Sequence, residues 1–481
     1  MIPRHRTALS RGGLSRPVKL ALEDGLLAVG ATFFDYGCGR GSDVRLLEAS
    51  GFSASGWDPN HAPDHPRHPA DVVNLGYVVN VIEDVDERRS ALEMAWSLSQ
   101  RVLIVAARMA FEELGQSLTR YGDGYLTSRG TFQKFFDHGE LRAWITDVVL
   151  ADPVAAAPGV FYVFKDGSAR ESFLARRERR GAAALRVSGT AVIFDRHRGA
   201  LESVVPFFGA RGRLPSADEV PAIGELLRAV PRVSAILEAL RSVVGAVQFD
   251  QVILERQQDL LVYLALARFN KRPALHRLPL DIQLDIRGLF ESYAAACATA
   301  DDLLRRVGDR SGREAAFEES QVGKRTGNAL YVHMSALEKL PMLLRVYEGC
   351  ARAYVGAVEG ATLVKLHRVK HQVSYLSYPR FERDAHPSLA ESLVVRLQDL
   401  AVDYRDYRSW QDPPVLHRKE LFLPEGHPKR VMFSRLTQRE QRLGLLNDIS
   451  RIGTLNGWAA VLRRAGVIVR GHRIVRAPGT E

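Results

Sequence analysis

Residues 30–59 carry the pattern from which the fold of this chain can be predicted. They contain the apolar run and glycine turn ATFFDYGCGRG at 31–41, a short helical pattern, and a second short strand that ends in SGWDP at 55–59. Alternate glycines let the backbone turn tightly and approach a ligand closely. The helix after the turn directs its free N–H groups toward that ligand. The stretch therefore predicts a strand–turn–helix–strand unit that binds a small molecule at the turn.

Two acids mark the ends of the two predicted strands. Asp35 immediately precedes the glycines, and Asp58 follows the second strand, where a carboxylate accepts hydrogen bonds from a ribose diol. The string DYGCGRG resembles the first motif of class I S-adenosylmethionine (SAM) methyltransferases rather than the GxGxxG of dinucleotide enzymes. This resemblance implies SAM as the cofactor, with the first acid near the methionine amine and the second on the ribose. The expected cofactor-binding residues are Asp35, Gly37, Cys38, Gly39, Gly41 and Asp58. A purely structural glycine turn in an ordinary α/β domain is the alternative.

The segment after Asp58 is too short for the helix and third strand that normally come next in such a domain. Residues 59–70 contain prolines at 63, 66 and 69, which forbid a regular helix. We therefore expect a reduced or missing third strand, with this loop or the first 29 residues covering the sheet edge. The loop also holds His61, His65 and His68, but without cysteines or paired acids they do not predict a metal site.

A second group of polar residues lies at the end of the next strand, in the string ADVVNLGYVVNVIED at 70–84. Asn74 falls at the expected strand end, and Tyr77 follows three residues later. Methyltransferases that act on exocyclic amines place Asn/Asp-Pro-Pro-aromatic there, and this chain has the Asn and the aromatic residue without the prolines. We predict Asn74 and Tyr77 as catalytic residues that position the acceptor. The alternative is that Tyr77 begins a helix and only packs.

The composition is that of a soluble globular protein with an uneven charge. Residues 1–180 hold 22 Lys and Arg against 23 Asp and Glu, and the rest of the chain holds 44 against 33. The excess of basic residues after position 180 is typical of a protein that binds a polyanion such as nucleic acid. The alternative is a basic surface that contacts only solvent.

Three dispersed cysteines and the lack of a long apolar run or a signal peptide indicate a cytoplasmic protein without a membrane anchor.

The pattern along the chain predicts an α/β fold in several parts. We expect a Rossmann-like methyltransferase domain with a reduced third strand at 1–166 and a basic linker helix at 167–185. A mainly helical region at 186–360 and a basic, mixed α+β region at 361–481 follow. In the last region basic residues alternate with aromatic ones, a pattern in which cations bind phosphates and rings stack on bases. The candidate nucleic-acid-binding residues are Lys365, His367, Arg368, Lys370, His417, Arg418 and Lys419.

Several strings together resemble the DNA phosphorothioation-associated methyltransferase family of bacteria. They include DYGCGRG at 35–41, GWDP at 56–59, LTSRGTFQK at 126–134, PGVFYVF at 158–164, VSYLSYP at 373–379 and PPVLHRKELF at 413–422. The resemblance implies a SAM-dependent transferase in the company of phosphorothioation or restriction proteins, and it does not supply the substrate. Together with the basic C-terminal part, it leads us to expect a methyltransferase that acts on nucleic acid, with DNA favoured over RNA. The missing third strand and the absent prolines favour an alternative. In that alternative the protein is a catalytically inactive SAM-binding accessory or defence protein that binds nucleic acid.

Overall fold

The computed structural model describes residues 2–113, 117–185, 196–230 and 232–477, and the chain divides into two compact units. The first unit combines Met1–Asp166, Phe317–Leu340 and Cys350–Glu481, and the second combines Gly167–Ala316 and Pro341–Gly349. The region that the sequence analysis separates at 361–481 is thus part of the same unit as residues 1–166. The first ten residues of the expected helical region, 186–195, lie outside the described residues.

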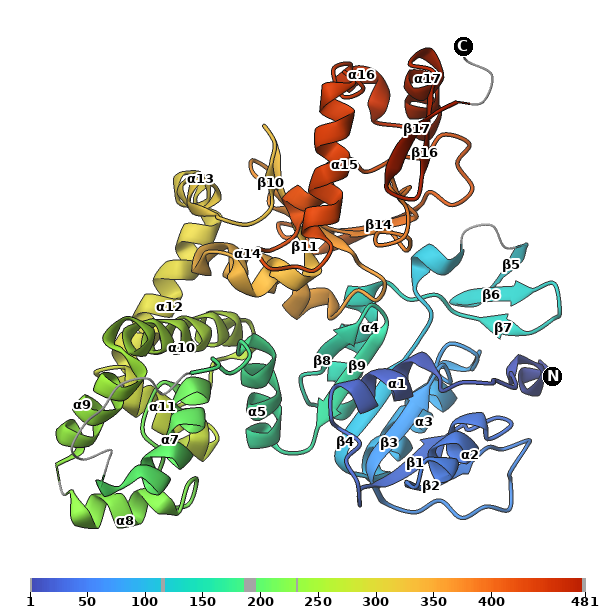
Figure 1. Ribbon diagram of the computed structural model, residues 1–481. Helices are drawn as coiled ribbons and strands as arrows, with labels where there is room; N and C mark the ends of the chain where they lie inside the picture. Colours follow the sequence, from blue (N-terminus) through green and yellow to red (C-terminus); the bar gives the residue numbers. More distant parts are fainter. Residues whose placement is uncertain (1, 114–116, 186–195, 231, 478–481) are drawn as a thin grey trace. The chain divides into compact units, whose positions relative to one another are not determined.

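A six-stranded sheet forms the centre of the N-terminal part of the first unit, with the strand order β2-β1-β3-β4-β9-β8 (Figure 1). Strands β1 to β4 run parallel, whereas β9 runs antiparallel to both β4 and β8. The chain order reverses between β1 and β3, as it does in Rossmann-like sheets, and ligands bind such sheets outside the carboxyl ends of the strands at that point. The elements are η1 Arg4–Thr7, α1 Arg16–Glu23, β1 Thr32–Tyr36, α2 Ser42–Ala49, β2 Ser53–Trp57, β3 Ala70–Gly76, α3 Val85–Leu98, β4 Ser99–Ala106, η2 Ala110–Glu113, β5 Leu118–Tyr121, β6 Gly124–Thr127, β7 Phe132–Gln133, α4 His138–Val149, β8 Val154–Ala157 and β9 Val160–Phe164.

Side chains along the buried strands point alternately to the two faces of the sheet, and the apolar ones on each face form its core. Phe34, Val73 and Leu103 point to one face, and the buried residues Leu92 of α3 and Ile145 of α4 belong to the same core cluster. Both helices carry capping signals that are visible in the sequence. Asp84 accepts the Glu87 N–H at the start of α3, and Asp137 with Glu140 forms a capping box on α4.

The expectation of a missing third strand is confirmed. Between β2 and β3 the structure has only an isolated bridge from Asp58 to Ala62, so β2 is the edge of the sheet. The proline-rich loop covers this edge, because His65 Nδ1 lies 3.1 Å from Gly56 O and His68 Nε2 lies 2.9 Å from Ser55 Oγ. The loop thus occupies the place where another strand would pair with β2.

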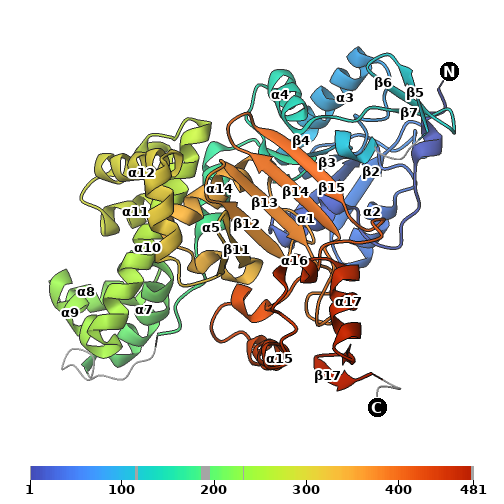
Figure 2. The same cartoon turned by 90° about the horizontal axis from the view of Figure 1, so that it is seen from above.

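A second, antiparallel sheet occupies the C-terminal part of the first unit, with the order β10-β11-β12-β13-β14-β15 (Figure 2). Its strands are β10 Lys324–Arg325, β11 Ala329–His333, β12 Leu363–His367, β13 Gln372–Ser377, β14 Glu391–Arg396 and β15 Ala401–Asp406. The elements around and after it are η5 Met334–Lys339, η6 Lys419–Phe422, α15 Arg430–Arg442, α16 Ile449–Ile452, α17 Leu455–Arg464, β16 Val467–Arg470 and β17 Arg473–Arg476, with β16 and β17 paired as a hairpin.

Direct contacts join the C-terminal part to the Rossmann-like sheet. The Ala357 N–H donates to Ala156 O at 2.7 Å, and the rings of Phe111 and Tyr404 stack with their centroids 4.8 Å apart. A Cβ on Gly356 would lie only 2.3 Å from the Ala156 carbonyl carbon, so the two backbones meet where only glycine fits. These contacts explain why the C-terminal strands do not form a separate region.

The second unit is helical. Its helices are α5 Gly167–Glu178, α7 Arg198–Arg211, α8 Ala222–Ala229, α9 Val233–Val244, α10 Ala246–Ala267, η3 Arg268–Asn270, η4 Leu275–Arg277, α11 Leu280–Leu289 and α12 Tyr293–Gly308. Helices α13 Arg310–Glu319 and α14 Met342–Val355 begin in this unit and end in the first. The segment expected as a linker helix is instead packed, because Phe173 and Glu171 of α5 are buried and the Tyr263 hydroxyl donates to Glu171 at 2.6 Å. In the described residues, no helix is long and apolar enough to cross a membrane.

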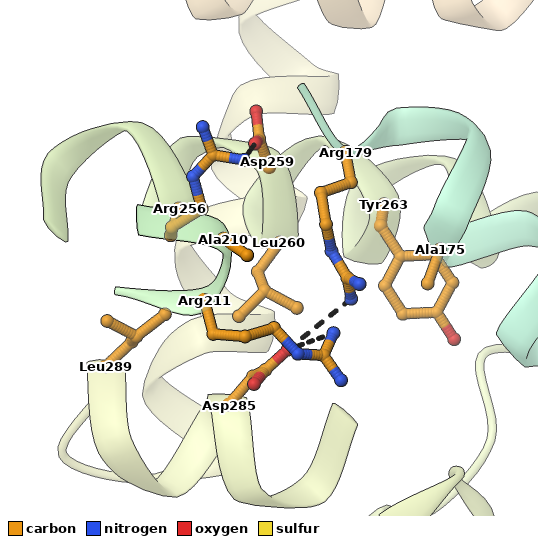
Figure 3. A pocket seen from close by; sticks show the side chains of 10 residues that line it. All are labelled: Ala175, Arg179, Ala210, Arg211, Arg256, Asp259, Leu260, Tyr263, Asp285 and Leu289. Atoms are coloured by element: carbon orange, nitrogen blue, oxygen red, sulfur yellow. Dashed lines mark hydrogen bonds and ion pairs between the residues drawn. The ribbon is translucent and has the colours of Figure 1, made fainter. Parts of the chain in front are cut away.

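Buried carboxylates and arginines hold the helices of the second unit together (Figure 3). Asp285 accepts from Arg213 at 2.7 Å and pairs with Arg211 at 3.1 Å, while Asp259 accepts from Arg345 at 2.7 Å and pairs with Arg256 at 3.1 Å. The cavity between them measures about 10 Å3, which has room for no more than a single water molecule. We therefore interpret this cluster as a structural network rather than a ligand site.

The close contact of β2 with the glycine turn gives a stability prediction. A Cβ on Gly56 would lie 2.8 Å from Cys38 Cβ and 3.0 Å from Val44 Cγ2. Replacing Gly56 by Ala should lower the free energy of unfolding by about 1–3 kcal/mol, because overpacking displaces the turn and helix α2. Urea denaturation measures the change, and Gly13→Ala is the control because a Cβ there meets no atom within 4 Å. Equal stability of the two variants would contradict the close approach.

Candidate functional site

The turn after β1 has a backbone that requires glycine. Gly37, Gly39 and Gly41 all have positive φ, at 83°, 51° and 68°. At Gly37 a Cβ would also lie 2.5 Å from Val78 Cγ2. Gly41 caps helix α2, so the helix begins directly at the turn. The predicted glycines therefore form a tight strand-to-helix turn at the carboxyl end of β1, beside the reversal of strand order.

The Asp58 carboxylate links this turn to the proline-rich loop. Its Oδ2 accepts the Gly39 N–H at 3.0 Å, and its Oδ1 accepts the N–H groups of Asn60 and His61, both at 2.9 Å. A carboxylate has about four lone-pair sites, so these three bonds leave one site for a ligand hydroxyl. Asp58 therefore holds the glycine turn and the loop in place and keeps one acceptor site available for a ligand.

Asp35 is buried at the end of β1 and hydrogen-bonded to Asn74 at the end of β3. The Asn74 Nδ2 donates to Asp35 Oδ1 at 2.8 Å, and both side chains are at least 95% buried. Desolvation raises the pKa of Asp35 to about 7, with a smaller contribution from the nearby Asp43. Among the described residues, Asn74 Oδ1 has no hydrogen-bond partner. A cationic amine next to Asp35 would stabilise its charged form.

The N-terminal segment lies against the glycine turn and helix α2. A Cβ on Gly39 would lie 3.1 Å from Ala8 Cβ, the Arg11 N–H donates to Ser42 Oγ at 3.2 Å, and the Ser15 N–H donates to Asp43 at 2.6 Å. Further out, Arg4 pairs with Glu83 at 2.7 Å. The segment that precedes α1 thus covers part of the carboxyl edge of the sheet.

Tyr77 lines a cavity of about 490 Å3 at the same edge of the sheet. Its φ of 62° is rare for a bulky residue, and its N–H donates to Ala106 O at the end of β4 at 2.8 Å. This backbone strain is typical of functional sites. The other lining residues come from both parts of the first unit and are Arg16, Phe111, Glu112, Pro158, Val358, Glu359, Ala361, Tyr375, Ser377, Glu391, Leu393, Tyr404, Asp406 and Arg408.

The cavity combines aromatic rings with charged groups. Glu391 accepts from the Tyr404 hydroxyl at 2.8 Å and pairs with Arg408 at 2.9 Å, whereas Arg16 pairs with Glu359 at 3.3 Å. Aromatic rings and charged groups of this kind can bind a flat, polar ligand through stacking and hydrogen bonds. Asn74 is not among the lining residues, so the structure does not bring the two predicted catalytic residues together in this cavity. Sequence spacing placed both at the end of β3 but could not show that Asn74 turns back to Asp35.

The structure corrects part of the predicted nucleic-acid surface. His417 and Lys419 are 8% and 2% exposed, and the Lys419 Nζ donates to Phe381 O at 2.7 Å, so neither side chain can contact a polyanion. His367 is half-buried with its ring 3.1 Å from Ser374 Oγ, and Arg368 pairs with Glu318. Lys370 is exposed, and Lys365 and Arg418 are partly exposed.

A more basic segment lies further along the chain, inside the predicted basic region at 361–481 but beyond the candidate residues named there. Residues 430–476 contain ten arginines and two acids, and one of the acids, Glu440, is buried. Eight of the arginines are exposed without an ion pair to any described residue: Arg435, Arg439, Arg442, Arg463, Arg464, Arg470, Arg473 and Arg476. A count of charges in short windows would have identified this segment. The nucleic-acid-binding residues were instead predicted at 365–419, because aromatic residues alternate with basic ones there.

Comparisons with known proteins give matches to solved structures alone. No family model and no curated protein matches the chain. Three similar structures are 1,6-didemethyltoxoflavin-N1-methyltransferase of Burkholderia thailandensis with S-adenosylhomocysteine, the amino pentose methyltransferase CalS10 of Micromonospora echinaspora with SAM, and magnesium protoporphyrin IX methyltransferase of Synechocystis with SAM.

These likenesses are limited to the N-terminal third. The identities are 14%, 17% and 14%, and each match covers 34% of this chain. The matches cover 79%, 94% and 90% of the other chains, and all three TM-scores are 0.24. Values this low do not carry a functional assignment. The function proposed below therefore rests on the strand order and on the contacts at the glycine turn.

The buried carboxyl of Asp35 predicts a pH dependence of stability. Its pKa is about 7 in the folded protein and about 3.9 in an unfolded chain, so the folded state binds the extra proton between these values. Stability should therefore fall as the pH rises from 4 to 7, and Asp35→Asn should remove this loss, gaining about 2 kcal/mol at pH 8 relative to pH 5. Urea denaturation across pH measures the effect. Asp64→Asn, at an exposed site, is the control, and an unchanged slope in Asp35→Asn would contradict the assignment.

Proposed function

We propose that this protein is a SAM-dependent methyltransferase. The observation that carries the proposal is the junction of the glycine turn with Asp35 and Asp58, at the point where the strand order reverses. Asp35 suits the methionine amine, the N-terminus of α2 suits the carboxylate, and Asp58 suits the ribose. The orphaned Asn74 Oδ1, buried beside Asp35, offers a further acceptor for the amine.

The cavity beside Tyr77 supports a transferase rather than a simple binding protein. The glycine turn ends β1 and Tyr77 follows the neighbouring strand β3, so a cofactor at the turn and an acceptor in the cavity would share one edge of the sheet. SAM supplies an activated methyl group when it is bound. The chain would contribute by holding the acceptor in line, and positioning of this kind accounts for most of the rate of such displacements. Glu112, Glu359, Glu391 and Asp406 line the cavity and offer carboxylates to take up the acceptor proton.

A SAM-binding protein without catalysis is the second candidate. Asn74 bonds to Asp35 instead of lining the cavity, so the acceptor would lack the amide that amino-methyltransferases use at this position. Methyl transfer from labelled SAM to cellular nucleic acid or small molecules distinguishes the candidates, because the binding protein would leave the label on SAM.

The cofactor assignment predicts that calorimetry detects SAM binding to the full chain. Asp58→Asn should weaken binding by about 1.5–3 kcal/mol, because it removes a charged acceptor from the ribose position. Asp64→Asn lies in the same loop, at an exposed position, and should bind SAM as the wild type does. Wild-type protein that does not bind SAM would refute the assignment. Equal affinity of Asp58→Asn would refute the role of Asp58.

We further propose that the protein binds DNA through residues 430–476. The turn at Gly453 and Thr454 joins α16 to α17, in the order of a helix-turn-helix unit, and the hairpin β16–β17 follows. Arg435, Arg439 and Arg442 share one face of α15, since they are spaced by four and three residues. The exposed arginines would neutralise phosphates, and α17 would approach a groove.

The proposed cellular role of this activity is based on the family resemblance in the sequence. That resemblance supports a role beside DNA phosphorothioation or restriction proteins in bacterial defence. The net charge of +10 and the exposed arginines support a polyanionic partner. The cavity beside Tyr77 would then receive a base or another acceptor that the DNA-binding surface delivers.

The DNA proposal predicts a salt-dependent affinity for duplex DNA that depends on α15. Replacing Arg435, Arg439 and Arg442 by Ala should reduce the slope of log K against log salt by roughly 0.9 for each phosphate that the variant no longer neutralises. Fluorescence anisotropy with the full chain at several salt concentrations measures the slope. The matched control replaces Lys365 and Lys370 by Ala. An effect confined to the control would return the site to the residues predicted from sequence.

A further inference from the structure

Two histidines and a glutamate that are distant in the sequence meet inside the C-terminal part of the first unit. His386 lies between β13 and β14, His417 precedes η6, and Glu440 is in α15. One potential ligand atom of each lies within 4.8 Å of the others. Within the described ranges of the chain, this is the one group of three such side chains that is close enough to share an ion.

The hydrogen bonding of His417 leaves one ring nitrogen available. Its Nε2 lies 2.6 Å from Ile452 O, so Nε2 carries the hydrogen and donates to this carbonyl. The Nδ1 then has a lone pair, and it is buried without a hydrogen-bond partner among the described residues. Metal-binding histidines commonly donate their other N–H to a backbone carbonyl in this way.

The remaining two side chains are also removed from water. The His386 Nε2 lies 2.7 Å from Glu440 Oε1, and their side chains are 6% and 1% exposed. A carboxylate buried this deeply is costly unless a cation or strong donors neutralise it. The ring of Trp458 lies 4.5 Å from the His386 ring and 4.7 Å from the His417 ring, between centroids, and restricts both imidazoles.

We propose that His386, His417 and Glu440 form a binding site for a divalent transition-metal ion, and that this ion is zinc. Two imidazole nitrogens and one carboxylate oxygen are a donor set that zinc binds tetrahedrally, with a fourth position open to water. Ligand bonds of about 2.0–2.2 Å place donor atoms roughly 3.3 Å apart, which lies between the shortest and the longest separations in this group. The ion would lie between His386 Nε2 and Glu440 Oε1, an oxygen that has no hydrogen-bond partner among the described residues, and it would tie α15 to the segments that carry the two histidines.

The competing explanation is a hydrogen-bonded core cluster that never binds metal, and it is distinguished by metal content. Untagged full-length protein is stripped with a chelator, incubated with zinc sulfate, desalted and analysed by mass spectrometry. We expect one zinc per chain, a higher thermal midpoint than in the stripped protein, and a visible absorption band of four-coordinate cobalt when Co2+ replaces zinc.

Conservative variants assign the ion to these three side chains. Glu440→Gln and His417→Gln keep polar groups of similar size, and circular dichroism verifies that each is folded. Both should lose the zinc and the cobalt band, whereas His472→Gln in the hairpin turn should keep them. Wild-type protein that holds no zinc after reconstitution would overturn the proposal. Zinc retained by folded Glu440→Gln and His417→Gln would also overturn it, because the ion would then bind elsewhere.

Discussion

The hydrogen bond from the Gly39 N–H to the Asp58 carboxylate connects the elements of the candidate cofactor site. It fixes the glycine turn of β1 against the end of β2, and the second oxygen of the same carboxylate starts the proline-rich loop at Asn60 and His61. The glycine turn also determines where α2 begins, because Gly41 caps that helix. The edge strand, the loop that covers it and the helix therefore share one anchor. Because the Asp58 carboxylate holds the turn and the loop together, the sheet can keep a defined edge at β2 without the usual third strand.

The cavity beside Tyr77 depends on the C-terminal sheet. Tyr77 and Phe111 come from the Rossmann-like part, whereas Tyr375, Glu391 and Tyr404 come from β13, β14 and β15. The stacking of Phe111 on Tyr404 joins the two sets of residues at the cavity itself. Ten of the fifteen lining residues lie between positions 358 and 408, so most of the cavity wall is missing until the second sheet is in place. The cavity wall thus depends on a segment more than 300 residues away from the glycine turn.

Local patterns predicted the parts of this structure that local physics controls. The glycine turn and the short proline-rich loop depend on backbone conformations that particular residues require, so spacing was sufficient to predict them. Interactions between distant segments were not predicted. Lys419 and His417 have the composition of a basic surface, yet Phe381, Ile452 and Trp458 enclose them. The same limit applies to Asn74, whose place at a strand end was predictable while its bond to Asp35 was not.

The discontinuous first unit has a consequence for the order in which the nascent chain folds. Ribosomes synthesise residues 167–316, most of the helical unit, before they reach β11, β12 and the other strands of the second sheet. Most of the helical unit is one continuous segment and can begin to fold early, whereas the first unit must wait for segments from both ends of the chain. Residues 1–166 then leave the ribosome before the strands β13 to β15, which line the cavity beside Tyr77 with them, have been synthesised. Chaperone dependence during synthesis is the expected result of this topology, and it would concentrate on residues 1–166.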